Sequence, residues 1–405
     1  MILNVRRIAD KVIKILFIAM LCSFLIFETY TWGKYIILAL TIAIMGFSMI
    51  ANGKIKISFK SYQFLFAMFI AFTALSMLWA TDSSRVRSQF ITLSLILICA
   101  SVVGWHFSLD KDAFSLIDAV KWTGYIVSLY SIVFYGFDYL LDATNSARLD
   151  NEFSNVNSIG ILASLSCVFQ VHQIAYKRSN VIALVLCIPS VMVVAATQSR
   201  KALLLLIVGV IGTIILKSID KMNLKTVIHI ILALCASVML LYLISRMSIF
   251  KGIFERMEGL IASITGSGTI DHSTEVRNKM VKIGFDTFLK HPIIGIGIGN
   301  SYIVTLEELM MSTYLHNNYI ELLCCGGIVG FSCYYSLHIY VVYNLLKYRK
   351  NDKEIFAIGI LWMLLILMLD WGMVSYNSKI QSYYLLINFL NVEFLKAKGK
   401  KYVNF

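Results

Sequence analysis

Apolar runs of membrane length follow one another along most of this chain, with short polar segments between them. A helix that crosses a hydrocarbon core of about 30 Å needs about 20 mostly apolar residues. This criterion predicts about twelve transmembrane helices, near residues 13–31, 35–51, 62–80, 90–106, 120–140, 156–175, 181–197, 202–217, 227–245, 318–346, 355–373 and 380–395. The longest polar segment, residues 246–317, lies between the predicted helices 9 and 10. We therefore predict an all-α integral membrane protein with one large loop.

Composition and charge favour a single polytopic domain over residues 1–405. Hydrophobic residues make up 59% of the chain and charged residues 15%, whereas soluble domains are about half apolar and a quarter charged. The formal charge of +13 does not require nucleic acid, because the basic residues cluster in short segments between apolar runs. With the N-terminus inside, 22 of the 36 Lys and Arg residues fall on the inner side. This bias predicts cytoplasmic termini and an extracytoplasmic loop at 246–317.

Two helices are expected inside the long loop. Residues 254–261 predict a short surface helix. Residues 276–289 alternate apolar and basic positions at roughly helical spacing, which is typical of an amphipathic helix lying in the membrane plane.

Metal and disulfide chemistry find little support in the sequence. All eight cysteines lie inside apolar runs, and none forms a C-x-x-C pair, so we interpret them as small buried hydrophobic residues. No H-E-x-x-H motif is present. The run Gly295-x-Gly297-x-Gly299 lacks the spacing of a nucleotide-binding fingerprint, and it more simply predicts a tight turn.

Three polar side chains are candidates for chemistry on the outer face. Arg200 lies at the corner between the predicted helices 7 and 8, Arg277 in the long loop, and His316 at the start of helix 10. A guanidinium group can hold a phosphate or pyrophosphate through paired hydrogen bonds. A histidine at a helix N-terminus meets the positive end of the helix dipole, which favours the neutral imidazole that accepts a proton.

Each candidate also has a structural interpretation. Arg200 could extend to the membrane interface with its stem in the apolar region. Arg277 could be a surface charge of the loop, and His316 could be a polar cap of the following helix.

Four segments then carry a family resemblance in the right order. They are the Arg148-Leu149 loop with Asn157, the Thr197-Gln198-Ser199-Arg200 corner, the loop of His291-Pro292, Gly295, Gly297 and Asn300, and the His316-Asn317 block with Glu321, Gly326, Gly327 and Gly330. Over roughly residues 148–330 they resemble the O-antigen ligase and O-antigen polymerase superfamily of bacterial polytopic membrane glycosyltransferases. The His-Asn block is the most specific part.

The resemblance implies a membrane glycosyltransferase (GT-C-like) bundle in the bacterial cytoplasmic (inner) membrane, with an extracytoplasmic active site. It implies a donor glycan carried on undecaprenyl pyrophosphate and a glycan acceptor. His316 would act as general base, and Arg200 and Arg277 would hold the departing pyrophosphate. Substrate binding is assigned to Arg148, Arg200, Arg277, Asn317 and Glu321.

The resemblance implies no cofactor and no metal, and a flippase and a chain-length regulator could be partner proteins. It leaves two enzymatic functions open. The first is a repeat-unit polymerase that extends a capsule or O-antigen chain. The second is a ligase that transfers the finished chain to lipid A core. A polysaccharide or lipid transporter is an alternative of a different class, but the sequence shows few intramembrane charges and no internal repeat.

Overall fold

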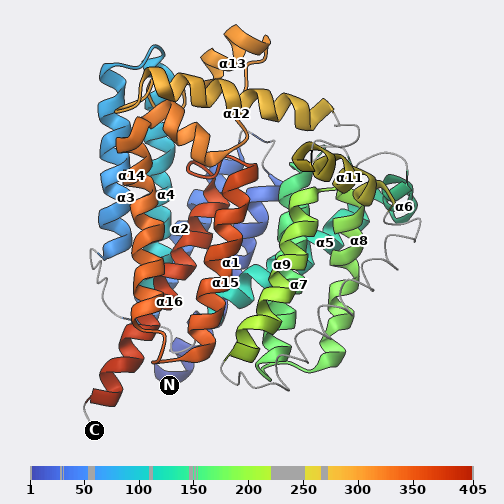
Figure 1. Ribbon diagram of the computed structural model, residues 1–405. Helices are drawn as coiled ribbons and strands as arrows, with labels where there is room; N and C mark the ends of the chain where they lie inside the picture. The colour runs from blue at the N-terminus through green and yellow to red at the C-terminus, as the bar shows by residue number, and fades with distance from the viewer. Residues whose placement is uncertain are drawn as a thin grey trace. The chain divides into compact units, whose positions relative to one another are not determined.

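The computed structural model is built from helices throughout the residues that it describes, which are 2–27, 30, 32–52, 60–108, 113–145, 149, 152, 154–219, 251–265 and 272–403. Its contacts divide the chain into two compact units. The first comprises Met1–Ala51 and Phe114–Thr269, and the second comprises Asn52–Ala113 and Ile270–Phe405. Each unit is described by itself below (Figure 1).

The first unit is organised around α7, which packs against α5, α8 and α9. Its described elements are α1 (Ile2–Ile26), α2 (Gly33–Asn52), α5 (Ser115–Tyr135), α6 (Phe137–Asn145), α7 (Val156–Ala175), the 3₁₀ helix η2 (Val181–Cys187), α8 (Ile188–Thr197), α9 (Arg200–Ile219) and α11 (Lys251–Thr265). Small residues permit close packing of these helices. A Cβ atom at Gly124 would lie 2.5 Å from the carbonyl oxygen of Leu162, so α5 approaches the backbone of α7 there.

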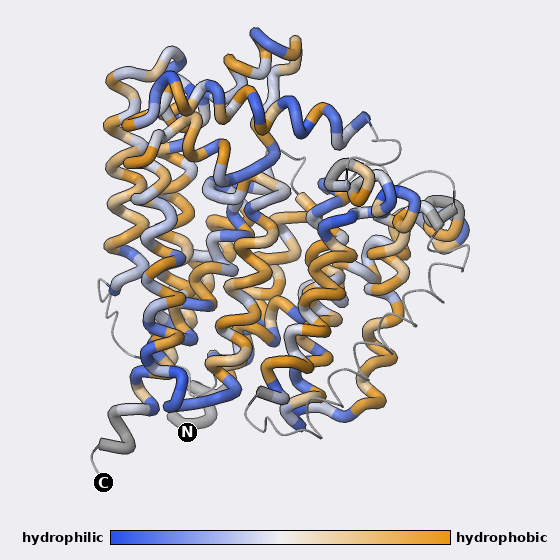
Figure 2. The backbone as a smooth tube through the Cα atoms, viewed as in Figure 1, coloured by the Kyte–Doolittle hydropathy of each residue, from blue (hydrophilic) through white to orange (hydrophobic). Residues whose placement is uncertain are grey.

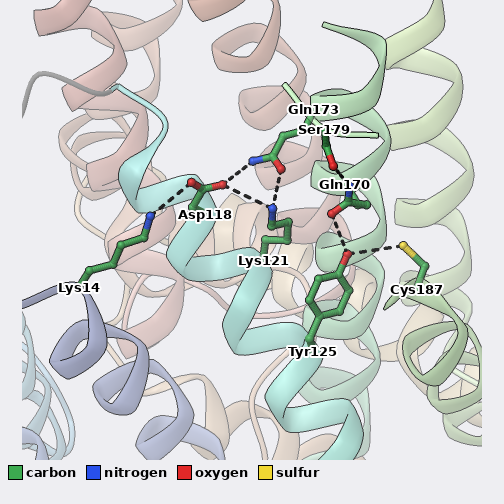
Figure 3. A network of polar contacts seen from close by, with 8 residues as sticks. All are labelled: Lys14, Asp118, Lys121, Tyr125, Gln170, Gln173, Ser179 and Cys187. Carbon is green, nitrogen blue, oxygen red and sulfur yellow. Dashed lines mark hydrogen bonds and ion pairs between the residues drawn. The ribbon is translucent and has the colours of Figure 1, made fainter. Parts of the chain in front are cut away.

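A polar network joins three helices of this unit (Figure 3). Asp118 of α5 accepts hydrogen bonds from Lys14 of α1, at 3.3 Å, and from the side-chain amide of Gln173 of α7. Lys121 lies 3.5 Å from the same carboxylate and donates to Gln173 at 2.5 Å. Because Lys121 is buried, these partners offset the cost of removing its charge from water.

The second unit contains the longest helix of the described chain, α14, packed against α3, α12 and α15. Its elements are α3 (Ser61–Leu75), the 3₁₀ helix η1 (Ser76–Leu78), α4 (Ser83–Phe107), α12 (His272–Lys290), α13 (Ser301–Leu309), α14 (Asn318–Lys347), α15 (Lys353–Gly372) and α16 (Lys379–Val403). Within this unit, α12 lies across the ends of the long helices and not along them (Figure 1).

Among the described residues, eight helices are long and apolar enough to cross a membrane. They are α2, α3 with η1, α4, α5, α7, α9, α14 and α15, and apolar positions extend along most of their length (Figure 2). The predicted spans at 13–31 and 380–395 fall on helices α1 and α16, and the span at 227–245 lies outside the described residues. The total of about twelve spans therefore stays a prediction.

The structure of two predicted segments differs in detail from the prediction. The apolar run 181–197 forms a 3₁₀ helix followed by the short helix α8, which begins with Pro189 in its first turn. The described part of the long loop contains three helices, of which α11 and α12 confirm the expected helices at 254–261 and 276–289, while α13 was not predicted. The single domain over residues 1–405 and the outer position of residues 246–317 stay predictions.

Candidate functional site

The Arg200 corner is a tight, buried turn between α8 and α9. Gln198 adopts a left-handed conformation with φ of 45°, which ends α8 and lets α9 start at Arg200. Arg200 is only 7% exposed, and its guanidinium donates to the backbone oxygen of Arg256 in α11 at 3.3 Å. The side chain of this predicted pyrophosphate ligand is therefore held against α11.

The segment before α7 lies beside this corner. The backbone N–H of Leu149 donates to the carbonyl of Ala196 at 3.3 Å, and Ser199 Oγ donates to Asn157 Oδ1 at 3.0 Å. Two of the four predicted motifs thus meet within the first unit. Arg148, the predicted substrate ligand of this segment, lies outside the described residues.

The other two motifs meet in the second unit, where α14 is broken. Gly327 has φ of 57° and ψ of −162°, a combination that is essentially restricted to glycine. A regular helix would join the carbonyls of Cys324 and Cys325 to the N–H groups of Ile328 and Val329. The break opens both of these hydrogen bonds.

The loop at 291–300 replaces the lost bonds. The two freed carbonyls accept N–H groups from this loop, and the two freed N–H groups donate to its carbonyls: Ile296 to Cys324 at 3.1 Å, Gly297 to Cys325 at 2.9 Å, Ile328 to Pro292 at 2.9 Å and Val329 to Ile293 at 3.1 Å. Irregular backbone at membrane depth is stable only when protein groups satisfy it. The glycine motif and the G-x-x-G motif therefore form one structural element.

Close approach explains the glycines of this element. A Cβ atom at Gly295 would lie 2.4 Å from the backbone carbon of Cys325.

A cavity of about 410 Å³ lies beside the loop, lined by Trp79, Thr81 and residues 291–296.

A carboxylate that the sequence analysis missed anchors the far end of the loop. Asp82 caps the N-terminus of α4, with its Oδ1 accepting from the N–H groups of Ser84 and Arg85, and its Oδ2 accepts from the Tyr302 hydroxyl at 2.6 Å. Hydrogen bonds from the side chains of Ser84 and Tyr302 and from the backbone of Arg85 lower the pKa of Asp82 to about 2. The same interaction raises the pKa of Tyr302. The signal for this residue is the helix-capping pattern Asp82-Ser83-Ser84.

His316 lies in a sharp turn immediately before α14. Its φ of 56° is in the left-handed region, and its ring lies 4.3 Å from that of Tyr314, measured between ring centroids. Asn317 caps α14 by accepting the N–H of Ile320 at 3.1 Å. The predicted proton acceptor therefore lies at a helix N-terminus, as the sequence indicates.

Arg277 lies on α12 and is half-buried. It precedes Gly284 by seven residues, which places both on one face of the helix about 10 Å apart. A Cβ atom at Gly284 would lie 2.5 Å from Leu315 and 2.6 Å from Ile320, so this face of α12 packs around the His316 turn. Arg277 and His316 thus belong to one unit, whereas Arg200 belongs to the other. Their convergence into one site stays a prediction.

Within the described part of the chain, no group of three or more His, Cys, Asp or Glu side chains could hold a metal ion. The polar groups that lie in and beside the two motif pairs are guanidinium, imidazole, amide, hydroxyl and carboxylate groups. Such groups can bind anions and accept or donate protons.

The helices and the two motif pairs define the class of protein: a polytopic membrane protein with polar groups at helix termini. Residues 182–335 match the family model described as O-antigen ligase, and the match confirms the resemblance to the O-antigen ligase and polymerase superfamily. No curated protein matches the chain.

Proposed function

We propose that this protein is a polysaccharide repeat-unit polymerase, which transfers a glycan from undecaprenyl pyrophosphate to a sugar hydroxyl of an acceptor. The match over residues 182–335 supports membrane glycosyltransfer of this kind, because it contains Arg200, Arg277 and the His316 turn. We place the reaction at the outer face of the bacterial cytoplasmic membrane, with both termini in the cytoplasm.

In the proposed reaction the acceptor hydroxyl oxygen forms a bond to the anomeric carbon of the donor glycan. The bond from that carbon to the pyrophosphate oxygen breaks, and undecaprenyl pyrophosphate leaves with the electron pair. His316 takes the proton of the acceptor hydroxyl, which contributes about 10²–10⁴-fold to the rate. Arg200 and Arg277 stabilise the charge that develops on the leaving pyrophosphate, and removing one such donor costs about 2.7–4 kcal/mol in comparable sites.

The substrate-binding roles of Arg148 and Asn317 remain part of this proposal, as do a flippase and a chain-length regulator as partners. Glu321, which the resemblance assigns to substrate binding, has both carboxylate oxygens engaged by protein groups and takes a different role. The ligase, which transfers a finished glycan to lipid A core, is the second candidate, since the name of the matching family favours it. A transporter is the alternative outside the enzymes.

Glycan gel analysis of a deletion strain tests the proposal. We expect loss of long chains with a single repeat unit still attached to its acceptor. Lipid-linked polymer that stays unattached would establish the ligase instead. Unchanged glycan length with precursor accumulating in the inner leaflet would establish transport and contradict both enzymatic functions.

A further inference from the structure

A buried carboxylate lies beside the His316 turn with both oxygens engaged by the protein. Glu321, in the first turn of α14, is 2% exposed. Its Oε1 accepts hydrogen bonds from Ser301 Oγ at 2.6 Å and from the Cys325 thiol at 3.8 Å, and its Oε2 accepts the backbone N–H of Leu315 at 3.0 Å. The carboxylate therefore links α14 to the start of α13 and to the residue that precedes His316.

These contacts fix the turn on both sides of the histidine. Leu315 is held by Glu321 from one side and by the packing of Gly284 from the other. On the far side of His316, the Asn317 side chain caps α14. The backbone carbonyl of Asn317 accepts the N–H of Glu321 at 2.9 Å. A non-glycine residue in the left-handed region is uncommon and needs such support from its surroundings.

We propose that Glu321 is a positioning residue, whose hydrogen bonds with Ser301 and Leu315 hold the His316 imidazole in the place where it accepts the proton of the acceptor hydroxyl. The inference rests on the proposed function and gives Glu321 a role other than direct contact with substrate. Its basis is geometric, because both carboxylate oxygens already have protein donors within 3.0 Å.

Hydrogen-bond geometry, and not negative charge, is the property required here. A glutamine has the same length, and its amide oxygen can accept from Leu315 while its NH₂ group donates to Ser301. An alanine leaves both partners without an acceptor. Glu321→Gln should therefore retain the turnover number within about threefold, whereas Glu321→Ala should lose about 100-fold, the effect of misplacing a catalytic group by about 1 Å.

The test uses the full-length protein in detergent, with the lipid-linked repeat unit extracted from the deletion strain as donor. Turnover is measured per folded protein, with the folded fraction taken from thermal unfolding. A variant that only lowers the amount of folded protein then leaves the measured turnover unchanged. Glu308→Ala is the matched control, because it removes an exposed carboxylate from α13. It should leave turnover and KM unchanged.

A double-mutant cycle with His316→Asn supplies the decisive readout. Asparagine tolerates the left-handed conformation but cannot act as the base. If Glu321 acts through the histidine, Glu321→Ala should cost little in the His316→Asn background. Full additivity, a raised KM with normal turnover, or a Glu321→Gln variant as impaired as Glu321→Ala would each overturn the positioning role. Normal activity of His316→Asn would instead overturn the proposed base.

Discussion

The side chain of Asn300 pairs with the backbone of Asp82 in both directions. Asn300 Oδ1 accepts the N–H of Asp82 at 2.8 Å, and its Nδ2 donates to the carbonyl of Asp82 at 3.3 Å. The loop at 291–300 is therefore tied to the start of α4 at one end and to the break in α14 at the other. Asn300 is fully buried, so an unmade hydrogen bond at this position has no water to replace it.

Asn300→Asp should destabilise the second unit by about 1–3 kcal/mol, because it removes the Nδ2 donor and brings a second carboxylate close to Asp82. The measurement is the thermal unfolding midpoint in detergent. Asp286→Asn, at an exposed position of α12, is the control and should change the midpoint little. An unchanged midpoint for Asn300→Asp would show that the pairing contributes nothing to stability.

The Asp82 carboxylate should make stability depend on acid. Its pKa falls from 3.8 to about 2 on folding, owing to its hydrogen bonds from Ser84, Tyr302 and Arg85. A depressed folded-state pKa means that the stabilisation is present above about pH 4 and disappears as the pH falls towards 2. The unfolding midpoint of the natural protein should therefore decrease over this range.

Tyr302→Phe provides the comparison, because it removes one donor and should bring the pKa of Asp82 part of the way back to its ordinary value. The natural protein and the variant should then differ most near neutral pH and converge in acid. A difference that stays constant from pH 7 to pH 2 would contradict this assignment.

Two adjacent glycines of α14 should respond very differently to alanine. At Gly327 an added Cβ would lie 2.4 Å from the backbone of Ile293, and its backbone angles suit glycine alone. At Gly326 the nearest atom is the flexible end of Ile298, at 3.2 Å. Gly327→Ala should cost at least about 2 kcal/mol from strain and overlap together, and Gly326→Ala less than half of that. Thermal unfolding of both variants checks the ranking, which equal midpoints would refute.

Some of these elements can be predicted from the sequence and others cannot, and the difference has a physical reason. The helices α4, α7 and α15 were found because each satisfies a local rule of length and apolarity. The amphipathic spacing of residues 276–289 likewise located α12. Both signals are contained in neighbouring residues.

The break in α14 was not predicted, because it depends on a partner distant in sequence. Residues 318–346 satisfy the rule for one continuous helix. The break is stable only because the loop at 291–300 supplies two donors and two acceptors. The motifs around Arg200, Arg277 and His316 locate candidate side chains, whereas the protein contacts of Glu321 depend on residues that only the three-dimensional fold brings together.

The polar network of the first unit should be sensitive to loss of its single acid. Asp118→Ala leaves buried Lys121 with Gln173 as its remaining partner in the network of Figure 3. We expect a loss of about 1–3 kcal/mol in the free energy of unfolding, as for other broken hydrogen bonds to charged groups. Thermal unfolding of Asp118→Ala measures this loss, and Glu258→Ala, which removes an exposed acid of α11, is the control. Equal effects of the two substitutions would mean that the pairing of buried Lys121 with Asp118 contributes nothing to the free energy of unfolding.

Arg200→Lys should abolish most of the proposed chain-extending activity, although it keeps the positive charge. Lysine is a point charge on a flexible stem and cannot reproduce the planar fork that grips a pyrophosphate. In this protein the fork is also fixed by the Arg256 carbonyl at 3.3 Å, a contact that sets its direction. We expect turnover to fall about 10²–10³-fold, as when one preorganised donor is removed from an anion-stabilising site. The measurement is polymer length and rate in the lipid-linked donor assay, with exposed Arg87→Lys of α4 as control. Long polymer at a normal rate from Arg200→Lys would show that this guanidinium does not act on the leaving group.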